Sequence, residues 1–322
     1  MATTAATAQE RAAELNVLVR KQRSLWQDAW YRLLRNKAAI VGMVVIALFM
    51  ITAAIVPTLT DLHILKSPTL QDGPHQLMEP FWTPNTQYHF SAYPLGSDQL
   101  GRDILSRLLW STRISMLVGF VPVAIIFMLG VTIGLSAGYF GGWVDQILMR
   151  ITDVIYAFPD LLFLFIIMAT LRNTALGDLQ GGLLLIFVAI AIVNWVGLAR
   201  LVRGQVLSLK EREFIEAARS IGAPSTRIMS RHLFPNILAP VIVSVAFGIP
   251  NAMLAEATLS FFGIGIRPPT ASWGVMINEG FVVFSATPWP VLLPALSISL
   301  VMLAFTFLGD GLRDALDPRM KT

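Results

Sequence analysis

The stretch Ile114–Tyr139 reads ISMLVGFVPVAIIFMLGVTIGLSAGY and contains no charged residue over 26 positions. A helix needs about 20 apolar residues to cross roughly 30 Å of hydrocarbon. Apolar runs in the core helices of soluble proteins rarely exceed about 14 residues. This stretch therefore predicts a membrane-spanning helix and argues against a large soluble domain.

The remainder of the chain has the same character. Of its 322 residues, 55% are hydrophobic and 14% charged, whereas a soluble domain carries about 25% charged residues. Five further runs have about the length of a span; the uncharged ones are 38–56, 181–199, 237–255 and 291–309, and 154–171 contains one acid, Asp160. We predict an all-α integral membrane protein with six transmembrane helices.

The basic residues indicate the orientation, because Lys and Arg accumulate in cytoplasmic loops. With the N-terminus inside, the inner segments hold 18 Lys and Arg and the outer segments hold six. We predict that both termini are cytoplasmic, together with a charged loop at 200–236. The first apolar run is of full spanning length and follows a long basic region, so it is not interpreted as a cleavable signal.

Two amphipathic stretches flank the predicted spans. Trp26, Trp30 and Leu33 recur at helical spacing before the first span, which predicts a helix lying in the inner interface. A second apolar stripe at 98–110 predicts a helix on the outer surface, capped by Ser97 or Asp98.

The outer loop from Pro57 to Leu95 spans 39 residues with six prolines and five aromatic residues. The prolines argue against a regular helix, and the aromatic residues argue against disorder. We predict a small folded cap over the outer mouth, with a flexible linker as the alternative. The alanine-rich segment 2–8 is expected to be disordered.

The cytoplasmic loop contains EFIEAARSIG at Glu213–Gly222. Phe214, Ala218 and Ile221 recur at near-helical spacing. Gly222 suits a left-handed C-terminal cap. These features predict a short helix that ends at the glycine.

A second short helix is expected at 225–231, stopped before Pro235. Two short helices in an L would make a knob, on which the small Ala217 and Ala218 allow another protein to approach. Glu216 offers a carboxylate to a basic or amide partner. The alternatives are a plain amphipathic loop on the membrane surface and a helix-turn-helix. The helix-turn-helix is disfavoured because the loop has only a small basic excess, seven basic against three acidic residues, and because both of its ends enter the membrane.

The segment 134–138 reads GLSAG and matches the G-x-S-x-G pattern inside a span. Six spans with such a serine resemble rhomboid-type intramembrane proteases. That chemistry needs a base near the serine, and none of the four histidines lies in a span. Helix packing by small residues is the favoured interpretation.

The sequence contains no P-loop, so any ATP must be hydrolysed by a partner. It also contains no cysteine and no H-E-x-x-H. His63, His75 and His89 share the outer loop, but their spacing is a weak metal pattern, and we predict neither a metal site nor a catalytic residue.

Polar residues and prolines inside spans are candidates for a pore or gate. These are Asp160, Asn194, Pro240, Pro250 and Glu256. The alternatives are snorkelling for Asp160, an interhelical hydrogen bond for Asn194, and simple kinks for the prolines.

Several motifs together resemble the second permease of oligopeptide and dipeptide ABC importers, the OppC/DppC family. The Glu213–Gly222 segment resembles the EAA loop of ABC importer permeases. His232 and Phe234 depart from the general permease pattern, and His is common in the peptide branch. The other matching segments are YPLGSDQLGRD at 93–103, AGYFGG at 137–142, AFP at 157–159, ARLVRG at 199–204, LSFFG at 259–263, PP at 268–269, SWG at 272–274 and LRDALDPR at 312–319.

The resemblance implies a type I ABC importer permease fold. Its parts are an N-terminal tail at 1–37, a first span at 38–56, an outer loop and elbow helix at 57–112, a permease core at 113–309 with the docking loop 200–236, and a tail at 310–322. The ATPase-docking residues are Glu216, Ala217, Ala218, Gly222 and Pro235, and the elbow motif contains Gly96, Asp98, Gly101, Arg102 and Asp103.

The resemblance also implies partners in the cell inner (cytoplasmic) membrane. They are a second homologous permease, two ABC ATPase subunits that bind ATP and Mg, an extracytoplasmic substrate-binding protein, and membrane lipid, but no nucleic acid. The chain itself needs no cofactor. The implied substrate is a short peptide, with nickel, glutathione or another small solute as the alternative and the protease as a remote one.

Overall fold

The computed structural model describes residues 25–83 and 93–317, most of which are helical. The prediction of an all-α architecture is confirmed. The segment 2–8 and the loop residues Pro84, Tyr88, His89 and Phe90 lie outside the described residues. The helices are α2 (Leu25–Leu33), α3 (Lys37–Asp61), α4 (Ile104–Phe140), α5 (Gly142–Tyr156), α6 (Asp160–Leu171), α7 (Ala175–Asp178), α8 (Leu183–Leu209), α9 (Glu213–Ser220), α10 (Ser225–Arg227), α11 (Phe234–Phe261), α12 (Trp273–Phe281) and α13 (Trp289–Leu316), with 3-10 turns at Gly73–His75 and Leu179–Gly182 and a π-helix at Ile228–Leu233.

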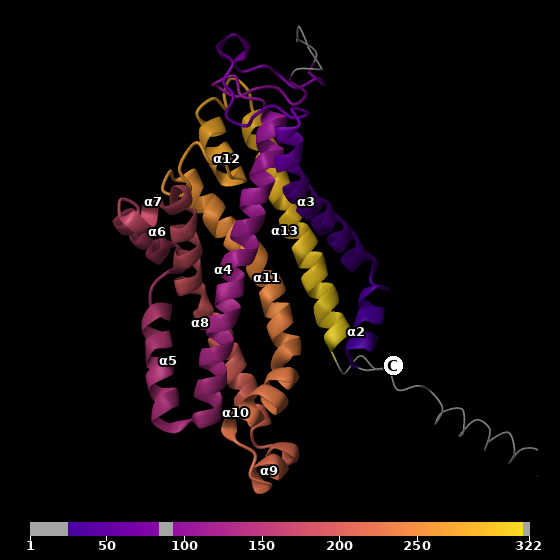
Figure 1. Cartoon of the computed structure of the whole chain (residues 1–322), viewed down its shortest axis with the longest axis vertical. Helices are drawn as coiled ribbons and strands as arrows, with labels where there is room; N and C mark the ends of the chain where they lie inside the picture. Colours follow the sequence, from indigo (N-terminus) through magenta and orange to yellow (C-terminus); the bar gives the residue numbers. More distant parts are fainter. Residues whose placement is uncertain (1–24, 84–92, 318–322) are drawn as a thin grey trace, which may run out of the picture.

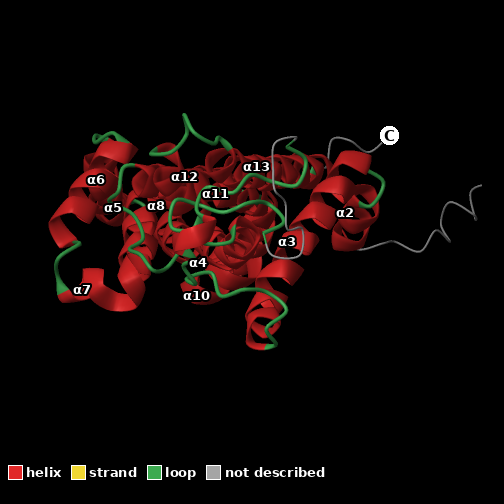
Figure 2. Ribbon diagram, turned by 90° about the horizontal axis from the view of Figure 1, so that it is seen from above, coloured by secondary structure: helices red, strands yellow, loops and turns green. Residues whose placement is uncertain are grey.

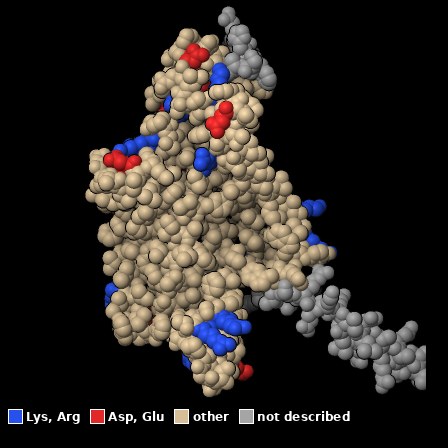
Figure 3. All heavy atoms as spheres, in the orientation of Figure 1, with Lys and Arg blue, Asp and Glu red and all other residues tan. Residues whose placement is uncertain are grey.

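The long helices run lengthwise through the molecule (Figure 1). Residues 62–83 and 93–103 lie at one end, here called the loop end, and α9 lies at the other, here called the knob end. Seen from above, α2 and α3 lie on one side and α5, α6 and α7 on the opposite side (Figure 2). On the face shown in Figure 3, charged residues gather towards the two ends and leave a mostly uncharged band between them.

Five helical elements are long and apolar enough to cross a membrane, and a bent pair raises the number of spans to as many as six. The pair is α5 and α6, which meet at 84°. The predicted sixth span at 154–171 therefore corresponds to the end of α5 and the whole of α6, with a sharp bend between them that the apolar pattern did not predict. Pro159 precedes α6, and a proline disfavours helical backbone in the residue before it, so the helix breaks there.

The core depends on close contact between α4 and α8. Gly134 and Gly138 on α4 face α8, where a Cβ at Gly134 would lie 2.5 Å from the carbonyl oxygen of Ala199. A Cβ at Gly138 would lie 2.7 Å from the Cβ of Val206. Ser136 donates its hydroxyl to the carbonyl of Thr132 at 2.8 Å. The interpretation of 134–138 as a helix-packing segment is confirmed, because small residues at this spacing let two backbones approach closely.

The predicted amphipathic helix before the first span is confirmed as α2. Ala29 and Leu33 pack with Ala315 near the end of α13. Trp26 and Trp30 on the other face stay exposed. Aromatic rings in this position suit the boundary between water and lipid.

Two helix boundaries differ from the predictions. α3 continues through Pro57 to Asp61, because a proline so near the helix end disrupts few bonds and Thr60 bonds the carbonyl of Val56. α4 begins at Ile104 with Asp103 as its cap, rather than at Asp98, and runs unbroken to Phe140. The predicted elbow helix and the second span are therefore one element.

Candidate functional sites

The knob end consists of α9 and the turn after it. Ile215 and Ala218 on one face of α9 belong to a buried cluster with Ile228 and Leu233. Gly222 then adopts φ +78°, a conformation that strains residues with a side chain. The prediction of a left-handed glycine at the end of this helix is confirmed.

The opposite face of α9 is open. Glu216 and Ala217 are exposed, and Phe214 and Ile221 are 43% and 85% exposed. Ala218 is only 5% exposed, which corrects the expectation that it offers a small side chain to another protein; it lets α9 pack closely on its own chain instead. Large apolar side chains exposed outside the lipid-facing band are typical of a protein-binding surface.

The second short helix predicted at 225–231 is not a separate element. α10, the π-helix and α11 form one helical element of 37 residues. Pro235 stands in the first turn of α11 and does not stop the helix. A π turn, Ile228–Leu233, lies directly before α11.

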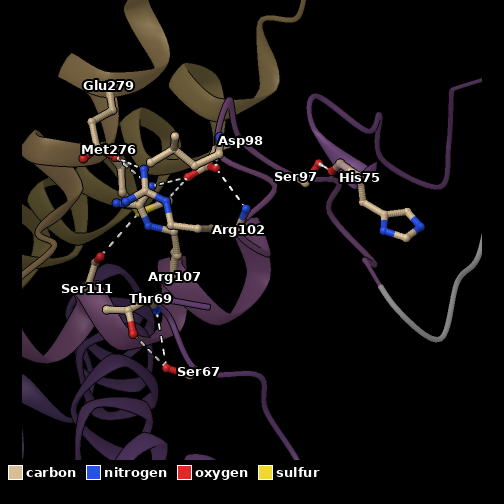
Figure 4. Close-up of polar contacts among 11 residues, drawn as sticks. Ser67, Thr69, His75, Ser97, Asp98, Arg102, Arg107, Ser111, Met276 and Glu279 are labelled. Carbon is tan, nitrogen blue, oxygen red and sulfur yellow. Dashed lines mark hydrogen bonds and ion pairs between the residues drawn. The ribbon is translucent and has the colours of Figure 1, made fainter. Parts of the chain in front are cut away.

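Four charged side chains, three of them buried and the fourth, Glu279, partly buried, lie together at the loop end (Figure 4). Arg102 bonds Asp98 at 2.7 Å and Glu279 at 2.6 Å. Arg107 bonds the same two carboxylates at 2.5 Å and 2.8 Å. The set is electrically neutral and joins the start of α4 to α12. Removal of any one member of such a set leaves a buried charge without its partner, which strongly destabilises the folded state.

The five residues of the predicted elbow motif all lie at 96–103, in the turn that leads into α4. Asp98 also accepts from the backbone N–H groups of Leu100 and Arg102. Asp103 accepts from the N–H of Ser106 at 2.9 Å and so caps α4; burial raises the pKa of the Asp103 carboxyl. Gly96 and Gly101 have positive φ, and each packs too closely on the loop backbone for a side chain.

Sequence reasoning missed Arg107 and Glu279. Glu279 is the only charged residue between Arg267 and Asp310. A lone acid in so long an uncharged segment is a signal that it has a buried partner. Its partner could not be identified from the sequence, because Arg102 lies 177 positions away.

The described part of the outer loop is folded, as predicted. Tyr93 donates its hydroxyl to Asp72 at 2.6 Å, and the ring of His75 stacks on Tyr93. The hydrogen bond from Tyr93 lowers the pKa of Asp72. Burial, with the bond to Asp72, raises the pKa of Tyr93 to about 12. Within the described ranges, no three His, Cys, Asp or Glu side chains are placed to hold a metal ion.

A groove of about 780 Å³ lies among α4, α8, α11 and α13. Asn194 and Pro240 line it, which brings together two of the five residues predicted for a pore. Asn194 donates its side-chain amide to the carbonyl of Ile190 at 2.9 Å. The residues that line the groove also include three that sequence reasoning missed, Gln205, Ser244 and Asn251.

The other three predicted pore residues lie away from the lining of this groove. Asp160 is exposed at the start of α6, and Pro250 is buried inside α11. Glu256 is buried and accepts hydroxyl hydrogen bonds from Ser260 and Ser272, both at 2.6 Å. Glu256 therefore ties α11 to the start of α12.

Comparison with known families identifies the class. The family described as "Binding-protein-dependent transport system inner membrane component" matches residues 130–322. The family described as "N-terminal TM domain of oligopeptide transport permease C" matches residues 24–80. The chain belongs to the family of binding-protein-dependent ABC transporter permeases. It is a multi-pass inner membrane protein and a transport subunit rather than a protease, and its class implies ATPase and binding-protein partners.

The similarity to individual relatives covers nearly the whole chain. The dipeptide permease DppC of Bacillus subtilis is 40% identical over 97% of this chain and 92% of that protein. The oligopeptide permease OppC of Haemophilus influenzae is 38% identical over 92% of this chain and 89% of that protein. The glutathione permease GsiD of Pectobacterium atrosepticum is 38% identical over 93% of each. The inward-facing methionine ABC transporter MetNI has a similar fold, with TM-score 0.53 and 18% identity over 66% of this chain and 98% of that one.

Proposed function

We propose that this chain is the permease subunit of an ATP-driven importer of short peptides. The similarity of nearly the full chain to a dipeptide and an oligopeptide permease carries the proposal. The groove supports it, because a lining of amide, hydroxyl and apolar groups suits a peptide better than a bare metal ion. Nickel uptake remains the alternative that the experiment below distinguishes.

The 18 to 6 distribution of basic residues supports an orientation with both termini and the knob in the cytoplasm. In this orientation the exposed side of α9, with Glu216, Ala217 and Ile221, docks on one of two ATPase subunits. The loop end receives the substrate-binding protein. A second, homologous permease covers the open side of the groove, and ATP and Mg are bound by the ATPases.

The orientation can be tested by labelling single cysteines, since the chain has none of its own. Ser225 and Thr69 are both exposed and lie at opposite ends. Ser225→Cys should react with an impermeant maleimide only after the membrane is opened, and Thr69→Cys should react in intact cells. Reaction of both from outside would disprove the orientation.

The substrate can be tested with the complete importer in liposomes. Uptake of labelled di- to pentapeptides should require ATP, both ATPases and the binding protein. Glu216→Lys places a cation in the docking surface and should abolish uptake at equal abundance, whereas Ser136→Ala should leave uptake intact. Uptake of nickel but of no peptide would contradict the proposal.

Glutathione is a second candidate because GsiD is as similar to this chain as OppC is. Glutathione is itself a tripeptide, so the same groove would accept it. Competition between labelled glutathione and a series of ordinary tripeptides distinguishes the two: a glutathione importer keeps its uptake in excess tripeptide.

A further inference from the structure

Three polar residues of the groove have unused hydrogen-bonding capacity. Gln205 on α8 and Ser244 and Asn251 on α11 line the groove, and none of them has a hydrogen-bond partner among the residues the structure describes. Asn194 uses its amide N–H on the carbonyl of Ile190, which leaves its side-chain oxygen free. These four side chains are here called the groove amides and hydroxyl.

Ser244 differs from most other helical hydroxyls of the chain. Thr132, Ser136 and Ser299 each donate to the carbonyl four residues earlier, at 2.6–2.9 Å. This bond satisfies a hydroxyl in a membrane helix without any ligand. Ser244 makes no such bond in the described structure although it lines the groove, so its hydroxyl is available to a solute.

The spacing of these groups matches an extended chain. Asn194 and Gln205 are three helical turns apart on the same face of α8, about 16 Å along its axis. Ser244 and Asn251 are two turns apart on α11, about 10 Å. The two helices run in opposite directions, so the groups form two facing rows. An extended peptide advances about 3.3–3.6 Å per residue, so the longer row spans about five residues.

The groove lining also lacks side-chain charge along most of its length. Its charged members among the described residues are Arg313 and Asp317, both near the C-terminal end of α13. A peptide that leaves water loses the hydrogen bonds of its backbone amides, and each unmatched group is costly. Side-chain amides and hydroxyls both donate and accept, so they match peptide N–H and C=O groups alike. Uncharged partners also bind weakly enough for the solute to leave.

We propose that Asn194, Gln205, Ser244 and Asn251 form a binding site within the permease for the backbone amides of the transported peptide. The site accepts peptides irrespective of their side-chain charge. This inference rests on the proposed peptide import and assigns its substrate contacts. The chemical group recognised is the secondary amide, which every peptide bond without proline supplies.

The test uses the complete importer in liposomes with binding protein saturated by each peptide. The maximal uptake rate is measured for trialanine, for tripeptides with a central Lys or Glu, and for trialanine methylated on its central nitrogen. Wild type should transport the methylated peptide several-fold more slowly. Asn194→Leu/Asn251→Leu should slow the three unmodified tripeptides by a similar factor of about five or more and remove the difference caused by methylation.

Ser299→Ala is the matched control, because its exposed hydroxyl is satisfied within α13; it should leave every rate unchanged. Ser244→Ala is a milder variant that should weaken the methylation difference if the double variant does not accumulate. Equal wild-type rates for methylated and unmethylated trialanine would overturn the inference, as would a loss confined to one charge class. Absence of peptide uptake by wild type would instead refute the proposed function.

Discussion

The charged residues at the two ends of the molecule differ in burial and in pairing. At the loop end, Asp98, Arg102 and Arg107 are buried and Glu279 is partly buried, and within the described chain their ion pairs are formed only with each other. At the knob end, the charges of α9 are exposed, and Glu216 has no ion pair within the described chain.

Large apolar residues are exposed at both ends, among them Ile64 at the loop end, which is 66% exposed. Trp82 of the outer loop contacts Trp289 at the start of α13 with ring centroids 5.1 Å apart, so that loop is held by its own chain. Ile221 at the knob end is 85% exposed. The two ends therefore differ in how their charges are paired: the loop end pairs its central charges within the chain, whereas the knob end presents charged groups that form no ion pair among the described residues together with apolar groups, as a surface does when another protein covers it.

The largest effect is expected from breaking the buried charges. Arg107→Met leaves Asp98 and Glu279 with one cation between them, which should lower the free energy of unfolding by about 3–5 kcal/mol. Arg227→Met removes an exposed arginine from the knob end and should change it by less than about 0.5 kcal/mol. Thermal unfolding in detergent measures both. Equal losses in the two variants would contradict the comparison.

Removing the exposed apolar group of the knob should affect association and not folding. Ile221→Ser should weaken binding of the ATPases by about 1–2 kcal/mol, because the apolar area that they cover is lost. Stability of the isolated chain should stay within about 0.5 kcal/mol. Binding is measured by titrating purified ATPase subunits onto the permease in nanodiscs. Unchanged affinity would place the docking surface elsewhere.

A pair of variants at Gly222 separates backbone strain from charge. Asn and Asp both tolerate the left-handed conformation better than other residues, and a Cβ at Gly222 meets no atom within 4 Å. Gly222→Asn and Gly222→Asp should each cost about 1 kcal/mol or less in stability. Only Gly222→Asp should uncouple uptake from ATP hydrolysis, because it adds charge to the contact. Matching uptake in both variants would remove Gly222 from the docking surface.

The smallest effect concerns the outer loop at low pH. Asp72 has a pKa below its ordinary value of about 3.9. Its ionised carboxylate therefore stabilises the folded loop fully at any pH above that ordinary value. The stabilisation is lost as the pH falls through the folded pKa. The protection factors for hydrogen exchange at 66–80, which correct for the intrinsic pH dependence of exchange, should therefore fall below about pH 4, and Asp72→Asn should have lower protection factors at neutral pH with a flatter pH profile. A pH profile identical to wild type would exclude this role.

Local patterns were sufficient for several elements. The apolar runs predicted the long helices, apolar and aromatic residues recurring at helical spacing predicted α2, and the position of Gly222 predicted its left-handed backbone. Each depends on neighbours within a few residues, so the sequence contains the whole signal.

Features that depend on distant contacts were missed. The pairing of Arg102 with Glu279 joins residues 177 positions apart, and no spacing rule connects them. Gln205, Ser244 and Asn251 look like ordinary helix residues until α8 and α11 are placed beside one groove. The break at Pro159 was missed because the apolar composition of 154–171 continues across it.

The continuous helical element from α10 to α11 has a mechanical consequence. Its 37 residues correspond to a rod of about 55 Å, with α9 at one end and the hydrogen bond that Ser272 donates to Glu256 near the other. A tilt of about 5° around one end of such a rod moves its far end by about 5 Å. If the element moves as a rigid body, it is a lever: a slight rotation at the knob end becomes a displacement as wide as a side chain at the other end of the helix.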